Sequence, residues 1–320
     1  MKENLLKLCE DFITNRDAVK EVFRSENSHA YPLCANIFCV RGMLVREEEL
    51  RQCRDILKKQ TGAFSPFRGK VSAPIAAMLA AGEFPIHRME QATANYEILR
   101  GVFPASDYLA LTAFLLTDMD VPQGVPALAE RARRLFDLMK KKHPFLSDPG
   151  DSVFAVLMAR SARSDGDLMK DLERCYTLLR RKFSAGNAAQ GAAEVLCLSS
   201  GRPEDKVAQV SALYDALRLR KKRYGKESEL AFLAALSISE TDITTLAEEI
   251  CQVDEFLSIQ KGYTGMFGVD KRSRLMQAAM IVSDEHAPRQ DAEISALAAT
   301  IAIIAAEQAA AAAAAASAAH

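Results

Sequence analysis

The sequence predicts an all-α protein, an α-solenoid of about six two-helix repeats with a period near 40 residues. The first observation is an internal repeat. Aromatic residues spaced 38 to 42 positions apart each open a similar tetrad, at Tyr96, Phe136, Tyr176, Tyr214 and Phe256. The second is a helical spacing of apolar residues that alternates with almost unbroken apolar segments, and the third is the lack of any persuasive strand pattern.

Each repeat is predicted to hold one amphipathic and one apolar helix. In residues 168–182, Leu168, Leu172 and Cys175 recur at helical spacing among charged residues. The second helix of a repeat, such as residues 192–198, is apolar nearly all round and must be covered on most sides. The turns are short, so neighbouring helices should be antiparallel.

The two ends of the chain are less regular than its middle. Residues 1 to 50 hold predicted helices around residues 5–14, 18–24 and 31–40, which form a degenerate first repeat. We expect one domain over residues 1–290, followed by an Ala-rich helix or tail at residues 291–320. The alanines favour a capping helix; a partner-binding or dimerising helix is the second interpretation, and a transmembrane helix the third.

The composition argues against several classes of protein. The formal net charge of −1 gives no global field toward nucleic acid or membranes. Seven cysteines without a CxxC pair predict buried free thiols in a reducing compartment, not a disulfide framework or a zinc site. The N-terminus has no long apolar segment of the kind found in signal peptides. We therefore expect a cytoplasmic protein without stable membrane insertion.

The repeat predicts where the charged residues lie in the folded chain. Cations end the first helix of each repeat, and acids follow the second. Because the two kinds of turn lie on opposite edges of a hairpin stack, we expect a basic edge and an acidic edge. Cations also stabilise helix C-termini through the helix dipole, which is the competing explanation. The predicted binding residues are Arg68, Lys140, Lys141, Lys142, Arg180, Arg181, Lys182, Arg220, Lys221, Lys222, Arg223 and Lys261.

No motif for nucleotide binding, metal binding or nucleophilic catalysis occurs, so we expect no metal and no cofactor. The catalytic candidates are His143, Asp148 and Asp151, an imidazole and two carboxylates in one turn that could do acid–base chemistry. The same pattern is typical of a proline that ends one helix before an Asp or Ser that caps the next. We favour this structural interpretation.

The turn at residues 62–69, Gly-Ala-Phe-Ser-Pro-Phe-Arg-Gly, is a further candidate. Its aromatic rings and Arg68 could present a stacked guanidinium to an anion, or the rings could plug the groove of the solenoid. Residues 260–265 form a similar Gly-bracketed turn in the last repeat.

Four segments resemble the recurring blocks of an uncharacterised bacterial family, domain of unknown function family 4003. They are residues 64–69, 143–146, 222–226 and 260–262. The resemblance covers nearly the whole chain. It implies a bacterial, cytoplasmic, all-helical protein, and it implies no activity, cofactor or catalytic residue.

The expected function is that of a binding scaffold that holds a protein or peptide, or an acidic ligand or nucleic acid, through its basic edge or concave groove. One alternative is an enzyme that uses His143 with Asp148 or Asp151. Another is a membrane-peripheral protein that docks through its C-terminal helix.

Overall fold

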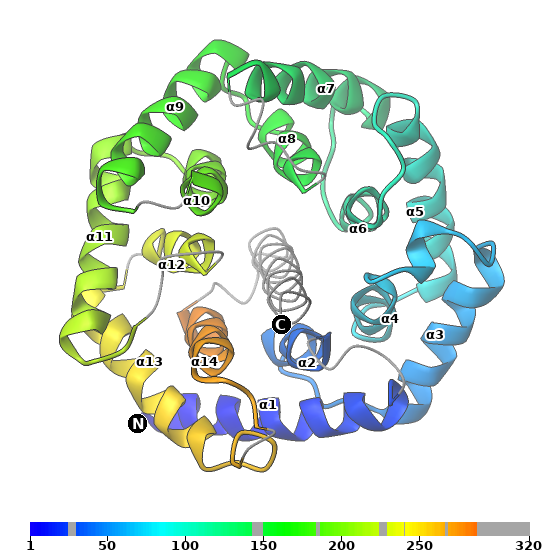
Figure 1. Cartoon of the computed structure of the whole chain (residues 1–320). Helices are drawn as coiled ribbons and strands as arrows, with labels where there is room; N and C mark the ends of the chain where they lie inside the picture. The colour runs from blue at the N-terminus through cyan, green and yellow to red at the C-terminus, as the bar shows by residue number, and fades with distance from the viewer. Residues whose placement is uncertain are drawn as a thin grey trace, which may run out of the picture. The chain divides into compact units, whose positions relative to one another are not determined.

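A computed structural model describes residues 1–24, 30–142, 150–183, 186–223, 229–239, 241–265 and 268–286. These residues form fourteen α-helices and one short 3-10 helix, with no strand among them (Figure 1). The predicted all-α class is therefore confirmed. The predicted helix or tail at residues 291–320 lies outside the described residues.

The helices follow one another along the chain with short connections. The odd-numbered helices are α1 (Glu3–Val22), α3 (Glu47–Gln60), α5 (Pro85–Arg100), α7 (Val125–Lys142), α9 (Asp165–Lys182), α11 (Pro203–Leu219) and α13 (Ile243–Ser258). The even-numbered helices are α2 (Ala30–Val40), α4 (Ser72–Ala80), α6 (Asp107–Leu115), α8 (Asp151–Ala159), α10 (Gly186–Leu198), α12 (Leu230–Ser237) and α14 (Lys271–His286). The 3-10 helix η1 (Pro66–Arg68) lies between α3 and α4.

The helix bounds correct one prediction. The two helices expected near residues 5–14 and 18–24 are a single helix, α1. No proline or glycine interrupts it, and Asn15, which lies between the two expected helices, is fully buried. The Asn15 side-chain amide donates to the carbonyl of Met43 at 3.0 Å, and its oxygen accepts from the amide of Val45 at 2.8 Å. Asn15 thus serves tertiary packing, while the backbone continues as helix.

The described residues form two compact units: residues 1–13 with 170–286, which we call unit 1, and residues 14–169, which we call unit 2. In unit 2, α5 packs against α3 and α7, while α4 packs against α2 and α6 packs against α8. Figure 1 shows α4 and α6 nearly end-on. In unit 1, α11 packs against α13, and α12 packs against α10 and α14. Within each unit, helices of the same parity are therefore neighbours.

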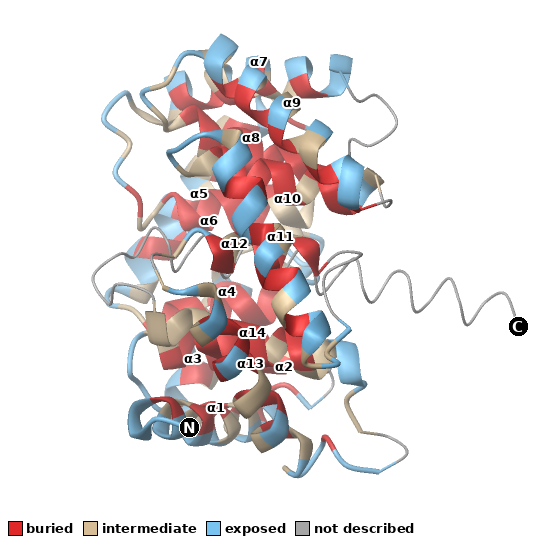
Figure 2. Cartoon of the chain, turned by 90° about the vertical axis from the view of Figure 1, so that its left-hand side faces the viewer, coloured by how far each residue is buried: buried red, intermediate tan, exposed pale blue. Residues whose placement is uncertain are grey.

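Burial follows the predicted division into amphipathic and apolar helices. In α3, the buried residues are Leu50, Cys53 and Leu57, which form one stripe at helical spacing. In α4, every residue except Ala80 is buried. Figure 2 shows the same contrast, with buried and exposed residues mixed along α11. The even-numbered helices supply much of the core of each unit.

Three of the repeated aromatic residues pack edge-to-face against a second ring that follows the preceding odd-numbered helix. Tyr96 on α5 meets Phe67 with ring centroids 5.4 Å apart. Phe136 on α7 meets Phe103 at 5.6 Å, and Tyr214 on α11 meets Phe183 at 5.2 Å. Such pairs contribute about 0.5–1.5 kcal/mol beyond their buried area. The aromatic period is therefore a packing period, which joins one odd-numbered helix to the next.

The start of the chain belongs to unit 1. The ammonium of Lys2 lies 2.8 Å from a carboxylate oxygen of Glu249 on α13, and the other oxygen of Glu249 pairs with the imidazole of His286 on α14. In a linear solenoid each repeat contacts only its sequence neighbours. Unit 1 departs from that pattern, because its first residues come from the opposite end of the sequence.

Candidate functional site

Most of the predicted binding residues lie at the ends of the odd-numbered helices or directly after them, while Arg68 lies in η1 and Lys261 lies in the turn after α13. Lys140, Lys141 and Lys142 are the last residues of α7, and Arg180, Arg181 and Lys182 are the last residues of α9. The residues 220–223 follow α11 directly. The structure sorts these cations into three groups, according to what their charged atoms contact.

The first group hydrogen-bonds backbone carbonyls. Arg180 donates to the carbonyl of Phe183 at 3.4 Å, and Arg220 donates to the carbonyl of Ala216 at 3.2 Å. Arg68 donates to the carbonyl of Thr61 at 2.6 Å and also to the carbonyl of Lys58, both at the end of α3. These guanidiniums stabilise helix C-termini, as the helix dipole favours.

The second group forms ion pairs with the next odd-numbered helix. The ammonium of Lys182 lies 2.6 Å from a carboxylate oxygen of Asp215 and 5.6 Å from the centre of the Tyr214 ring. Lys222 pairs with Asp254, a buried residue of α13 that Arg274 also contacts at 2.7 Å. The charges of Lys182 and Lys222 are therefore neutralised within unit 1.

The third group is exposed and makes no side-chain hydrogen bond or ion pair with any residue the structure describes. In unit 2 it is Lys140, Lys141 and Lys142, which we call the lysine cluster. In unit 1 it contains Arg181, Lys221 and Arg223. Lys261, in the turn after α13, is exposed but belongs to none of these three groups. The lysine cluster places three adjacent positive charges in the last turn of α7.

Several acids of the predicted acidic edge are neutralised inside their own unit. Asp165 lies 2.8 Å from Arg131 in unit 2, and Glu204 lies 2.7 Å from Arg174 in unit 1. The hydrogen bond with Arg174 is the main cause that lowers the pKa of Glu204. Each of these acids begins one odd-numbered helix and pairs with a cation of the preceding one. These acids therefore join helices instead of forming a free surface.

The sequence did not predict two buried cations, each of which connects its own helix to a carboxylate and to a backbone carbonyl of two other segments. Lys206, which is almost fully buried, lies 2.9 Å from a carboxylate oxygen of Asp171 and donates to the carbonyl of Leu196 at 2.8 Å. Arg88 likewise donates to the carbonyl of Met78 at 2.7 Å and pairs with Asp118. Both cations come three residues after a proline that begins their helix, a signal that could have found them.

Of the catalytic candidates, the structure describes one. His143 and Asp148 lie outside the described residues. Asp151 is the first residue of α8 and is buried. Among the described residues, no group of three or more His, Cys, Asp or Glu side chains could hold a metal ion.

All seven cysteines are free thiols, and all but Cys251 are buried. Burial raises the pKa of Cys9 to about 12 and that of Cys53 to about 11. A thiol with so high a pKa is protonated at neutral pH and is a poor nucleophile. The predicted buried thiols are therefore present, and their environment is typical of core residues.

The helices that the structure describes include none long and apolar enough to cross a membrane.

Comparison with known proteins gives one match. Residues 15–310 match the model of a family described as a protein of unknown function, DUF4003. No curated protein and no solved structure shows a significant match to the chain.

Proposed function

We propose that this chain, which belongs to the DUF4003 family of proteins of unknown function, is a helical-repeat scaffold that binds an acidic segment of a partner protein. The observation that carries the proposal is the lysine cluster, whose three charges have no partner among the described residues. An α-solenoid of two-helix repeats is part of the proposal. The contacts between helices of the same parity and the repeated ring pairs support it.

Helix capping accounts poorly for the lysine cluster. One cation near the last turn is enough to interact with the helix dipole, whose effect falls off within that turn. Like charges held close together repel one another. At the matching end of α9, Arg180 donates a hydrogen bond to a backbone carbonyl and Lys182 forms an ion pair with Asp215. At α7, by contrast, the charges face solvent, where a row of carboxylates would neutralise them.

The surroundings of the cluster favour an acidic protein segment over nucleic acid. Sites for single-stranded nucleic acid combine cations with exposed aromatic rings on which the bases stack. The aromatic residue nearest in sequence among those described, Phe136, instead packs against Phe103. We further propose that the scaffold works in the bacterial cytoplasm, and the free thiols, which are typical of a reducing compartment, support this proposal.

The test is binding of a labelled oligoglutamate peptide, measured by fluorescence anisotropy at low and at physiological ionic strength. The variant Lys140→Glu/Lys141→Glu/Lys142→Glu should lower the affinity about tenfold or more. The matched control reverses three dispersed, exposed lysines, Lys7, Lys20 and Lys271, and so changes the net charge equally. The control should retain most of the affinity, and both variants should keep the wild-type circular dichroism spectrum.

Two results would contradict the proposal. Equal losses in both triple variants would show that only net charge matters. Binding of a single-stranded oligonucleotide without binding of the peptide would assign the cluster to another class of partner.

A further inference from the structure

The turn between α3 and α4 is held in place from several sides. Phe67 is buried and packs edge-to-face on Tyr96. Arg68 bonds the carbonyls at the end of α3, and the backbone amide of Lys70 donates to a carboxylate oxygen of Asp107 at 2.9 Å. The turn thus supplies one ring to the core, while its arginine is used within the chain.

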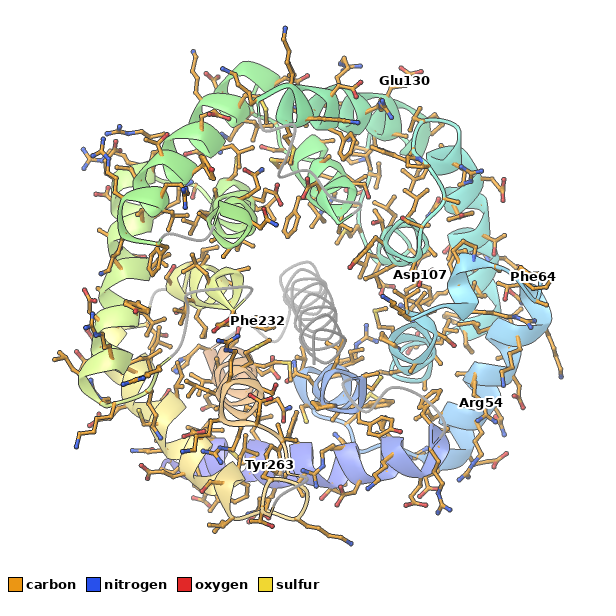
Figure 3. The ribbon with its side chains drawn as sticks, viewed as in Figure 1. Arg54, Phe64, Asp107, Glu130, Phe232 and Tyr263 are labelled. Atoms are coloured by element: carbon orange, nitrogen blue, oxygen red, sulfur yellow. The ribbon has the colours of Figure 1, made fainter. Side chains whose placement is uncertain are left out.

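The second ring of this turn has the opposite environment. Phe64 is fully exposed, and Figure 3 shows its side chain pointing away from the ribbon of unit 2. Gly62 and Ala63, which precede it, are also exposed and offer little apolar surface of their own. A large aromatic side chain is therefore presented to solvent at the tip of an anchored turn. Such preorganisation lowers the entropy cost of binding.

The segment that carries Phe64 is rich in cations. Residues 56–82 contain four cations and no Asp or Glu, whereas Asp55 and Glu83 flank this range and the carboxylate of Asp107 accepts from the backbone amide of Lys70. Lys58, Lys59 and Lys70 are exposed, and none of their ammonium groups forms a hydrogen bond or ion pair with a described residue. These lysines have long apolar stems that can lie along an apolar phase while the ammonium remains at its polar boundary.

The start of α5 adds apolar surface next to this segment. The side-chain amide of Gln60, the last residue of α3, lies 3.5 Å from the carbonyl of Ile86. Ile86 is 55% exposed, and Phe84 is 73% exposed. Phe84 has a φ of 49°, the left-handed conformation that residues other than glycine rarely adopt. Phe84 therefore adds another exposed aromatic ring at the start of α5.

We propose that the Phe64 turn is a docking surface for an anionic lipid bilayer, in which Phe64 enters the interfacial region while Lys58, Lys59 and Lys70 contact lipid headgroups. Exposed aromatic residues flanked by lysines are the side chains that membrane interfaces favour. Anionic lipid attracts each nearby cation independently of any particular lipid structure. This inference does not depend on the proposed scaffold function, because it uses a different part of unit 2.

A bilayer fits this surface better than a protein partner does. A protein-binding hot spot lies at the centre of a packed apolar contact and is surrounded by residues that exclude water. Gly62 and Ala63, which precede Phe64, provide no such rim, and the Phe64 side chain points away from the ribbon (Figure 3). A fluid bilayer closes around a single protruding ring, whereas a protein would need a matching pocket.

The absence of tryptophan from the chain makes a direct test possible. The variant Phe64→Trp carries a single indole at the tip of the turn. With vesicles of phosphatidylcholine and phosphatidylglycerol, its emission should shift to shorter wavelength, and brominated acyl chains should quench it. Soluble glycerol phosphate should cause neither effect. Vesicles of phosphatidylcholine alone should cause a much smaller shift, since they lack the negative charge.

Cosedimentation of the full chain with the same vesicles measures the contribution of each side chain. Phe64→Ala should lower the partition coefficient roughly tenfold, since the apolar ring is lost. Lys58→Gln/Lys59→Gln should lower it by about fivefold per lysine on anionic vesicles only. The control Leu219→Ala removes an 83% exposed apolar side chain from unit 1 and should leave the partition unchanged.

Several outcomes would overturn the inference: no cosedimentation of the wild-type chain with anionic vesicles, an indole emission that does not shift, or Phe64→Ala partitioning like the wild type. Binding of oligoglutamate or an oligonucleotide with the same dependence on Phe64 would assign the turn to a soluble partner instead. The lysine-cluster variant should bind vesicles normally, so failure of the scaffold proposal and failure of this one are distinguishable.

Discussion

Tyr214 meets Phe183 edge-to-face, with ring centroids 5.2 Å apart and ring planes at 87°. Phe183 follows the last residue of α9, and Tyr214 lies in the second half of α11. The contact joins the end of one odd-numbered helix to the body of the next. Lys182 sits over the same tyrosine ring and pairs with Asp215, so aromatic and ionic contacts support one junction.

We expect this ring pair to stabilise unit 1 beyond the area that it buries. Phe183→Ala should lower the free energy of unfolding by about 3–5 kcal/mol, since Phe183 is almost completely buried. A double-mutant cycle with Phe183→Leu and Tyr214→Leu should give a coupling energy of about 0.5–1.5 kcal/mol, measured by urea unfolding. Strict additivity of the two leucine variants would show that the rings only fill volume.

The buried pair of Lys206 and Asp171 gives a second prediction. Lys206→Met removes the cation from a carboxylate and a carbonyl that stay buried, so it should cost about 3–5 kcal/mol of unfolding free energy. Adding Asp171→Leu should recover part of that loss, because the uncompensated charge disappears. The control Lys271→Met, at an exposed position, should change the stability by less than about 0.5 kcal/mol. A double variant as unstable as Lys206→Met alone would contradict this account.

The third prediction concerns acid pH. Burial acts to raise the pKa of Glu249, but the hydrogen bonds from Lys2 and His286, together with their charges, outweigh it and lower the pKa below its ordinary value of 4.5. A carboxyl whose pKa is lowered by folding stabilises the folded state above its unfolded pKa, and this contribution is lost as the pH falls below it.

The measurement is the unfolding free energy of the wild type and of Glu249→Gln from neutral to acid pH. The carboxyl's contribution to this difference should be fully present well above pH 4.5 and should shrink progressively as the pH falls through that value and below it. Glu130→Gln is the control, because Glu130 is exposed on α7 (Figure 3). A difference that does not change with pH would show that the Glu249 carboxyl is not stabilised by its partners.

Two glycines should respond to the same substitution in opposite ways. Gly191 lies within α10, and a methyl group added there meets no atom within 4 Å. Gly191→Ala should therefore raise the stability by about 0.5–1 kcal/mol. A methyl group on Gly268 would lie 2.7 Å from the backbone of Tyr263, which cannot yield without moving the turn. Gly268→Ala should cost about 1–3 kcal/mol in the same thermal or urea unfolding measurement, and equal effects would contradict the assigned packing.

The sequence predicted the helix class and several helices, because hydrophobic spacing is a local signal. The expected helix at residues 31–40 corresponds to α2, and the apolar segment at 192–198 lies within α10. The sequence did not predict that α1 is a single helix, because the residues that hydrogen-bond Asn15 lie far from it along the chain. In the sequence, Asn15 looks like a polar interruption of the helix. Its role becomes clear only from the structure, where its side-chain amide hydrogen-bonds the backbone of residues 43–45.

The cation clusters show the limit of the same reasoning at the candidate site. Their position at helix ends was predictable from the repeat. Which charges stay free was not, because the partner of Lys182 lies on the next odd-numbered helix, 33 residues away. Arg68 was expected to face a ligand, and the structure gives its guanidinium to carbonyls that α3 leaves unpaired. In the sequence, Lys140 and Lys182 look alike. Only the three-dimensional structure shows that Lys182 has an ion-pair partner and that Lys140 has none among the described residues.

The composition of unit 1 has a consequence for how the chain is made. Its first 13 residues leave the ribosome before all of unit 2, and Glu249, which pairs with Lys2, leaves it after all of unit 2. Leu5, Cys9 and Phe12 are fully buried in the folded chain and belong to this unit, whose other residues begin at position 170. Unit 2 can fold in the meantime. Unit 1 therefore cannot be complete until residues beyond unit 2 have been made, and apolar residues that stay exposed for so long are of the kind that makes chaperones necessary.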